Sequence, residues 1–178
     1  MREIFKLSGT GIAQLIKAGE VSAVDVMEQA LKRADEIQTR LNPFVTITHD
    51  DALMQAKKAD EVLRQSEPQS LPVFFGVPFT VKDLLDTEGV RTTYGSRSLE
   101  KNITHKDIVA VARMRAAGAI LLGKTTTPEF ASKVTTDSVL SGITRNPWAP
   151  LLSAGGSSGG DCVVVATGVA PLGVSTDG

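Results

Sequence analysis

Ser153-Ala154-Gly155-Gly156-Ser157-Ser158-Gly159-Gly160 is a stretch in which two adjacent serines lie between two pairs of glycines. Glycine adopts tight turns at little steric cost, so this loop can bring its backbone and hydroxyls close to a substrate. Two stretches accompany it: Gly76-Val77-Pro78-Phe79-Thr80-Val81-Lys82-Asp83, an apolar strand that ends in a lysine, and Ser175-Thr176-Asp177-Gly178. A lysine, a glycine-embedded serine pair and a second glycine turn therefore follow one another along the chain.

These residue types suit the cleavage of an amide, which needs a nucleophile, a stabilised oxyanion and a proton for the leaving nitrogen. A serine hydroxyl is a weak nucleophile unless a base removes its proton. The two histidines, His49 and His105, lie in no recognisable triad sequence. A neutral lysine can act as the base, and burial lowers the pKa of a lysine. Lys82, at the end of an apolar strand, is the candidate base.

Each candidate also has a purely structural interpretation. Lys82 can be a solvent-facing strand end paired with Asp83, because most lysines are exposed. The glycine-rich loop can be a turn with incidental serines, and Thr176-Asp177-Gly178 can be a plain turn. The order of the three stretches favours catalysis over these alternatives.

The chain resembles the amidase signature family along nearly its whole length. The family's motifs occur here in the family's order, at Gly76 to Asp83, Arg115 to Ala119, Gly123 to Phe130, Asn146-Pro147-Trp148, Gly155 to Gly160 and Thr176-Asp177-Gly178. The resemblance implies that Lys82 is the catalytic lysine and that Ser157, on a cis peptide bond, is the bridging serine. It also implies that Ser158 supports this network, that Thr176, Asp177 and Gly178 begin the oxyanion turn, and that the nucleophilic serine would lie just past Gly178.

What the resemblance implies for function is an amidase that hydrolyses a carboxamide through an acyl-serine intermediate with a Ser-Ser-Lys triad, without metal or organic cofactor. The expected partner is a small-molecule amide of unknown identity, and a homo-oligomer stays open. Family members are typically more than twice this long, so we expect an N-terminal portion of one domain that is inactive alone.

Two alternatives remain: the A subunit of a glutamyl-tRNA amidotransferase, which works with partner subunits, and a truncated, non-catalytic protein that only binds ligands or partners. Thr127-Pro128-Glu129-Phe130 favours a free-standing amidase, because the amidotransferase chain more often has Asp before the Glu.

Three residues depart from the family's pattern: Ala154 replaces a usual Pro, Asp161 replaces a small residue and Thr126 replaces a frequent Asn. None of these positions is the lysine or the bridging serine, so the mechanism is expected to be retained.

Composition limits the class of protein. The 178 residues carry 19 basic and 20 acidic side chains, with six Phe, one Trp and one Tyr, so a basic, aromatic-rich nucleic-acid surface is not expected. No charge run suggests a membrane surface, and charges interrupt the first residues, where a signal peptide would be apolar. The cytoplasm is therefore the expected location.

The single cysteine, Cys162, allows no intrachain disulfide. Its valine neighbours predict that its side chain is buried.

Hydrophobic periodicity predicts two helices in the first 70 residues. Ser22, with Asp25 three residues later, is typical of a helix start, and apolar residues then recur at helical spacing until Asn42-Pro43. A short strand at 44–48 and a second helix at 51–65 follow. We interpret residues 1–70 as a mainly helical outer layer.

Residues 71–178 are predicted to begin the α/β catalytic core. An apolar strand at 71–81, a helix at 107–117 with Asp107 as N-cap and Gly118 just past its end, and a strand at 119–122 form a crossover unit. Uninterrupted apolar strands indicate a mixed, largely buried sheet with helices on both faces.

Gly118 to Thr125 also fits the phosphate-loop pattern G-x-x-x-x-G-K-[ST]. A phosphate loop follows a strand and opens a helix, whereas here the first glycine follows a helix and the four middle residues are the apolar strand. Nucleotide binding is therefore not expected. Lys124 is expected to be an ordinary strand-end residue that can line the cleft.

Overall fold

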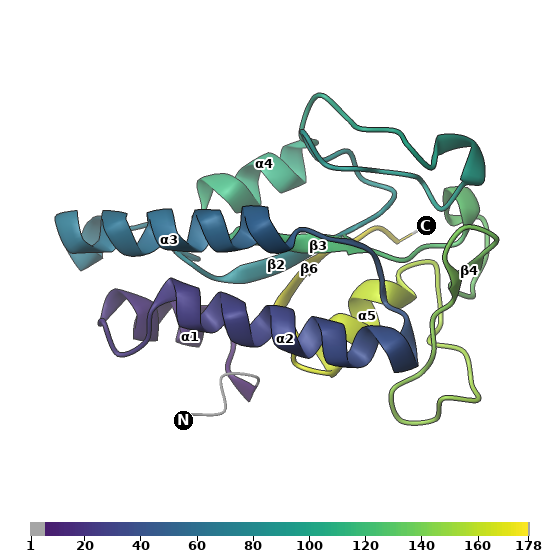
Figure 1. The fold of residues 1–178 in the computed structure, drawn as a ribbon, viewed down its shortest axis with the longest axis horizontal. Coiled ribbons are helices and arrows are strands. Elements are labelled where there is room, and N and C mark those ends of the chain that lie inside the picture. The colour runs from purple at the N-terminus through teal and green to yellow at the C-terminus, as the bar shows by residue number, and fades with distance from the viewer. Residues whose placement is uncertain (1–5, 178) are drawn as a thin grey trace.

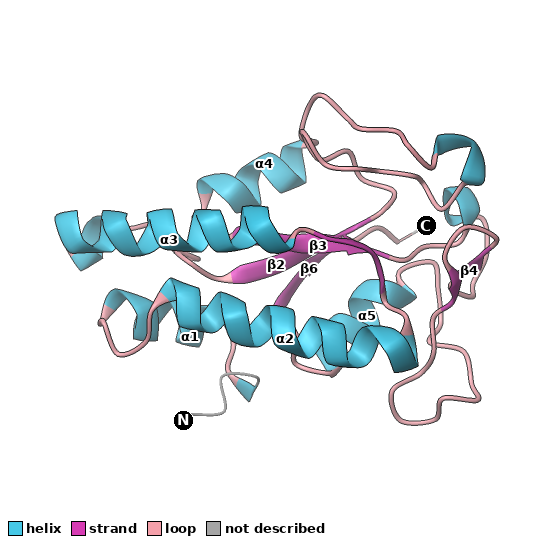
Figure 2. Ribbon diagram, in the orientation of Figure 1, coloured by secondary structure: helices cyan, strands magenta, loops and turns pink. Residues whose placement is uncertain are grey.

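The protein is described by a computed structural model, in which residues 6–177 are described. Its elements, shown in Figures 1 and 2, are α1 (Gly9–Lys17), α2 (Ala23–Leu41), β1 (Phe44–Ile47), α3 (His49–Gln65), η2 (Pro68–Ser70), β2 (Pro78–Lys82), η3 (Arg97–Leu99), α4 (Val109–Ala116), β3 (Ile120–Thr125), η4 (Glu129–Ala131), β4 (Asp137–Ser138), β5 (Gly142–Ile143), α5 (Gly159–Ala166) and β6 (Leu172–Val174).

The main sheet has the strand order β1-β3-β2-β6. β2 runs parallel to both β3 and β6, whereas β1 pairs with β3 in the antiparallel sense. The predicted crossover is therefore present, with α4 connecting β2 to β3. The mixed sheet of the predicted α/β fold is confirmed, and β1, from the first 70 residues, is one of its edge strands.

Helices cover both faces of this sheet. In Figure 1, α1, α2 and α5 lie below the strands and α4 lies above them. One apolar core joins α1, α2, α3 and α5 to the sheet through side chains such as Leu122 and Val163. A second core packs Val111 of α4 against Phe79 and Val81 of β2.

The helix predicted from Ser22 to Asn42 is confirmed as α2. The Ser22 hydroxyl accepts a hydrogen bond from the Asp25 N–H at 2.9 Å, and the Asp25 carboxylate accepts from the Ser22 N–H, so the capping box is complete. Asn42 ends the helix in the left-handed conformation, with φ 52°. The buried face of α2 is the predicted apolar stripe.

The strand predicted at 71–81 is wrong in its first half, because only Pro78–Lys82 is a strand. The preceding residues form turns, with Gly76 at φ 75°, and the Phe74 and Gly76 N–H groups donate to the Ala117 and Gly118 carbonyls. Leu71, Phe75 and Val77 are buried, but Val73 is exposed. Proline at 72 and glycine at 76 bend the backbone away from a strand.

Two further local predictions need correction. Asp107 is not the N-cap of α4. Ile108 occupies that position, and the Asp107 carboxylate accepts from the Glu88 N–H and pairs with Arg115 instead. Cys162 is exposed rather than buried, because α5 turns Val163 and Val164 toward the core and Cys162 away from it. The helix α1 was not predicted.

Gly118 to Thr125 forms a helix end followed by β3, as predicted. Among residues 6–177, no helix is long and apolar enough to cross a lipid bilayer.

Candidate active site

Lys82 is the last residue of β2, and its side chain is completely buried, with an exposed fraction of 0%. Side chains alternate between the two faces of a strand. Phe79 and Val81 therefore pack against the α4 side, whereas Thr80 and Lys82 face α5. The apolar strand carries the lysine into the interior, so the interpretation of Lys82 as a solvent-facing strand end is wrong.

Three hydroxyl groups surround the Lys82 amine. Its Nζ donates to Ser157 Oγ at 2.6 Å, to Ser158 Oγ at 2.9 Å and to Thr176 Oγ1 at 2.8 Å. Ser158 Oγ in turn donates to the Thr176 carbonyl at 2.9 Å. A lysine ammonium has three N–H donors, so each of them has a partner in this arrangement.

The glycine-rich loop brings the serines to the lysine. The Gly156–Ser157 peptide bond is cis, as the resemblance implies, and Ser158 directly precedes α5. A Cβ atom at Gly160 would lie 2.5 Å from the Thr126 backbone nitrogen, and one at Gly159 would lie 2.4 Å from Thr136 Oγ1. Glycine is therefore required where α5 begins, because the helix backbone lies too close to Thr126 and Thr136 for a side chain to fit.

Burial sets the electrostatics of the lysine. Loss of solvent lowers the pKa of Lys82 below its ordinary value, while the negative charges of Asp161 and Asp177 act to raise it. The net direction is downward, toward the neutral amine that a general base requires. When Lys82 is neutral, its lone pair can accept the proton of Ser157 across the same 2.6 Å contact.

Asp83, the next residue along the chain, does not pair with Lys82. Both of its carboxylate oxygens accept hydrogen bonds from the Thr93 N–H at 3.1 Å, and one also accepts from the Thr93 hydroxyl. Burial raises the pKa of this carboxyl group. Asp83 thus holds the long connection after β2 in place.

Lys124 is a second buried lysine, which corrects the expectation of an ordinary strand-end residue. Its Nζ donates to the Leu85 carbonyl, to Thr87 Oγ1 at 2.8 Å and to Thr92 Oγ1 at 3.1 Å. Burial lowers the pKa of Lys124 to about 8. A shift in register between Phe79 and Thr80 leaves an extra residue in β3 and turns Lys124 to the face opposite Lys82.

The structure brings together most of the residues singled out in the sequence. Ser157, Ser158 and Thr176 contact Lys82, and Asp177 is exposed but acts on it by its charge. Gly178 lies outside the described residues. His49, in contrast, contacts Asp35 at the surface. The catalytic roles of these residues stay predictions.

Asp161 was noted in the sequence only as a departure from the family's pattern. It is buried in the first turn of α5 and contacts Thr80 and Ser175. An acidic residue directly after a serine–glycine loop could have drawn attention, but nothing in the sequence shows that it is buried beside Lys82.

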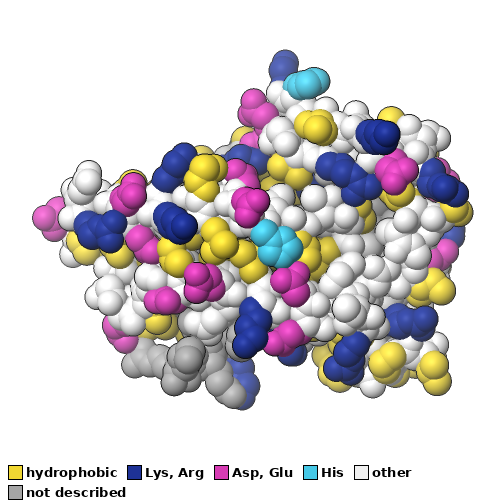
Figure 3. Space-filling view, in the orientation of Figure 1, with side chains coloured by type: hydrophobic (Ala, Val, Ile, Leu, Met, Phe, Trp, Pro, Cys, Tyr) yellow, Lys and Arg dark blue, Asp and Glu magenta, His cyan; other side chains and the backbone are white. Residues whose placement is uncertain are grey.

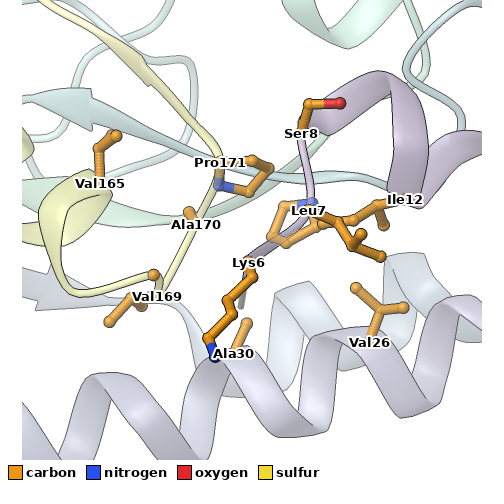
Figure 4. A pocket seen from close by; sticks show the side chains of 12 residues that line it. Lys6, Leu7, Ser8, Ile12, Val26, Ala30, Val165, Val169, Ala170 and Pro171 are labelled. Carbon is orange, nitrogen blue, oxygen red and sulfur yellow. The ribbon is translucent and has the colours of Figure 1, made fainter. Parts of the chain in front are cut away.

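A separate cavity of about 280 Å³ lies at the other end of β2. It is lined by Pro78 and by residues of α2 and of the turn after α5, including Ala30 and Val169 (Figure 4). Pro78 and Lys82 are the two ends of β2, roughly 13 Å apart at the ordinary rise of a strand. None of the residues that contact Lys82 lines this cavity.

Comparison with known proteins gives a consistent result. A family model described as Amidase matches residues 25–178. The chain is 40% identical over 171 residues to the A subunit of the glutamyl-tRNA(Gln) amidotransferase from Symbiobacterium thermophilum, a match that covers 96% of this chain and 35% of that protein. It is 39% identical over 178 residues to the corresponding protein from Geotalea daltonii, with coverages of 99% and 36%. The chain thus spans about a third of the length of these curated relatives.

Solved structures of amide-cleaving enzymes share the fold. A fatty acid amide hydrolase superimposes with a TM-score of 0.92 at 29% identity, over 98% of this chain and 30% of that one. A bacterial aryl acylamidase described as an amidase signature enzyme gives a TM-score of 0.88 at 30% identity, over 94% and 34%. The chain therefore belongs to the amidase signature family.

Proposed function

We propose that this chain contributes the lysine and the bridging serine of an amidase that hydrolyses a carboxamide to a carboxylate and ammonia or an amine. The observation that carries the proposal is the 2.6 Å contact between the buried Lys82 amine and Ser157 Oγ. A buried lysine with a lowered pKa, hydrogen-bonded to a serine in a glycine-rich turn, has the groups that proton transfer to and from a nucleophile requires.

The reaction would proceed through an acyl-serine intermediate with a Ser-Ser-Lys triad. A nucleophilic serine outside residues 1–178 attacks the amide carbonyl and passes its proton to Ser157, which passes its own proton to neutral Lys82. The same route returns a proton to the leaving nitrogen, because a hydroxyl both donates and accepts. Backbone N–H groups of the turn that begins at Thr176 and Asp177 would stabilise the oxyanion.

The proposal is tested by replacing the two proton-transfer residues in a form of the protein that turns over a simple amide. We expect Lys82→Ala to abolish nearly all activity, and Ser157→Ala to slow acylation by roughly 10²- to 10⁴-fold, the usual contribution of a general acid or base. Lys133→Ala is the matched control, because Lys133 pairs with Asp137 at the surface. Ammonia release and single-turnover acylation are measured on a panel of amides.

Turnover by Lys82→Ala at the rate of the unsubstituted protein would overturn the assignment of the base. An effect of Ser157→Ala confined to KM would make Ser157 part of a structural turn. The 178-residue chain alone should release no ammonia, since the proposed nucleophile lies outside it. Turnover by that chain would refute the Ser-Ser-Lys assignment.

A second candidate function is that of the A subunit of an amidotransferase. It is favoured by curated relatives that are such chains of glutamyl-tRNA(Gln) amidotransferases, with identities that include 34% and 40%. The sequence feature that favours a free-standing amidase is Pro128 before Glu129, where the amidotransferase chain more often has Asp. Hydrolysis of simple amides without any other protein would support the free-standing enzyme. Glutamine hydrolysis that depends on tRNA and on partner subunits would support the amidotransferase.

A non-catalytic binding protein is the remaining alternative, and binding of an amide without turnover in a longer form would support it. The amide substrate, a cytoplasmic location and the absence of nucleic-acid and membrane partners stay proposals that rest on the sequence.

A further inference from the structure

Asp161 is a buried carboxylate that connects three parts of the candidate site. Its exposed fraction is 5%. Its Oδ1 accepts a hydrogen bond from the Thr80 hydroxyl at 2.6 Å, and its Oδ2 accepts one from the Ser175 hydroxyl. Thr80 lies two residues before Lys82 on β2, Ser175 directly precedes Thr176, and Asp161 is in the first turn of the helix that follows Ser157. The carboxylate therefore links the helix after the serine loop to β2 and to the segment that carries Thr176.

The neighbouring strand leaves room for this side chain. A Cβ atom at Gly173 in β6 would lie 3.1 Å from both Cγ and Oδ1 of Asp161. At such a distance the Asp161 carboxyl group would have to shift by a few tenths of an ångström to make room for an alanine side chain. Gly173 and Asp161 are thus complementary in shape.

The site contains equal numbers of buried acidic and basic side chains. Within residues 6–177, the ionisable side chains classed as buried are those of Lys82, Lys124, Asp83 and Asp161. Asp83 and Lys124 attract each other near the connection after β2, on one side of the sheet. Asp161 is the buried acid on the side of Lys82. An unbalanced buried charge is costly, so each buried lysine benefits from a nearby carboxylate.

We propose that Asp161 is a positioning residue that ties β2, α5 and the segment after β6 together around Lys82 and supplies the negative charge that balances its ammonium form. This inference rests on the proposed function for its catalytic meaning, but its physical content concerns Lys82 alone. Asp161 acts through its electric field and through Thr80 and Ser175, since the Lys82 amine itself donates to three hydroxyls.

The charge of Asp161 has a defined effect on the protonation of Lys82. Burial lowers the pKa of Lys82, and the negative charge of Asp161 opposes this; Asp177 after β6 and Cys162 on α5 act in the same direction as Asp161. Lys124 on β3 also lies within the field of Asp161. Asp161 therefore keeps Lys82 protonated to higher pH than burial alone would allow, and places the acid limb of the pH–rate profile at higher pH.

The test is the titration of Lys82 in Asp161→Asn, followed by NMR of ¹³Cε-labelled lysine without substrate. Asparagine has the shape of aspartate and keeps polar atoms for Thr80 and Ser175, but it removes the charge. We expect the ratio of neutral to charged Lys82 at a given pH to rise about tenfold, the lower end of the effect of losing a nearby opposite charge. Asp137→Asn is the matched control, because Asp137 pairs with Lys133 at the surface, and it should leave Lys82 unchanged.

A second measurement needs no substitution at Asp161. The carboxyl ¹³C resonance of Asp161 in the unsubstituted protein should be that of a carboxylate at pH 7, although burial raises the pKa of this group. A protonated Asp161 at pH 7, or a Lys82 titration that is identical in Asp161→Asn, would overturn the proposal.

Neither measurement involves catalysis, so failure of the amidase assignment gives a different result from failure of this inference. In a form that turns over amides, Asp161→Asn should move the acid limb of kcat/KM to lower pH. A purely structural role would lower the rate at every pH without moving that limb.

Discussion

Lys82 and Lys124 show how one residue's environment depends on which face of the sheet it occupies. Val81 pairs with Lys124 and Lys82 with Thr125, so the two lysines are neighbours on adjacent strands. Lys82 faces the serines of the glycine-rich loop, and Lys124 faces the hydroxyls of Thr87 and Thr92. Both are buried, but only Lys82 contacts the residues proposed to move protons.

The lowered pKa of Lys124 predicts a pH dependence of stability. Its pKa is about 8 in the folded protein against 10.5 for an ordinary lysine, so the unfolded chain binds more protons between these values. Stability therefore rises with pH from about 8 to 10.5, by about 3 kcal/mol in total for this group. The measurement is urea unfolding of the unsubstituted protein and of Lys124→Met across this range.

The difference in free energy of unfolding between the two proteins isolates Lys124, because other titrating groups contribute to both. We expect this difference to shift with pH in favour of the unsubstituted protein. A difference independent of pH would mean that Lys124 titrates normally in the folded state.

At the scale of elements, the position of α5 depends on Gly160, which allows the helix to lie against Thr126. Its first turn lies against the backbone at Thr126, and the serines directly before it contact Lys82. The opposite face of the helix carries the exposed Cys162. A short helix with one buried face thus fixes both the serine loop and Asp161.

Gly160→Ala is predicted to destabilise the protein, since the added Cβ would meet the Thr126 nitrogen at 2.5 Å. Overpacking of this kind typically costs about 1–3 kcal/mol. Gly11→Ala in α1 is the matched control: it adds a methyl group to a helix with only ordinary contacts, the nearest at 3.4 Å. Alanine is favoured over glycine in a helix by roughly 1 kcal/mol, so Gly11→Ala should be neutral or stabilising.

Urea unfolding of both variants checks this prediction. Equal stability of Gly160→Ala and the unsubstituted protein would mean that α5 can move away from Thr126 without cost, and that its position is not fixed by this contact.

For the whole molecule, large exposed apolar side chains gather between η4 and α5. Val134, Val139, Trp148, Leu151 and Leu152 have exposed fractions of 84%, 82%, 78%, 96% and 63%. The loops that carry them lie at the right of Figure 1, where apolar side chains are also visible in Figure 3. Exposed apolar patches of soluble proteins are commonly sites of interaction.

We predict that the 178-residue chain binds a hydrophobic dye through these loops. Trp148→Ser combined with Leu151→Ser and Leu152→Ser should reduce the dye fluorescence. Val62→Ser on α3, which removes another exposed apolar side chain, should change it little. Equal fluorescence of the triple variant and the unsubstituted chain would place the dye elsewhere.

The sequence by itself determined the family, the fold class and the elements with strong local signals. The capping box and apolar stripe of α2, the crossover from β2 through α4 to β3, and the lysine at the end of an apolar strand all depend on residues close together in the chain. Motif order identified Lys82, Ser157, Ser158 and Thr176 before their contacts were known. Weak local signals gave wrong boundaries, as at Pro72, Gly76 and Asp107.

Only the tertiary structure decided which side chains meet. The partners of Lys82 lie 75, 76 and 94 residues away in the sequence, and no local pattern specifies such contacts. The shift in register between β2 and β3 turned Lys124 to the far face, and the packing of α5 exposed Cys162 and buried Asp161. Burial and charge balance arise from elements packed together, because a side chain's solvation depends on its neighbours in space rather than in sequence.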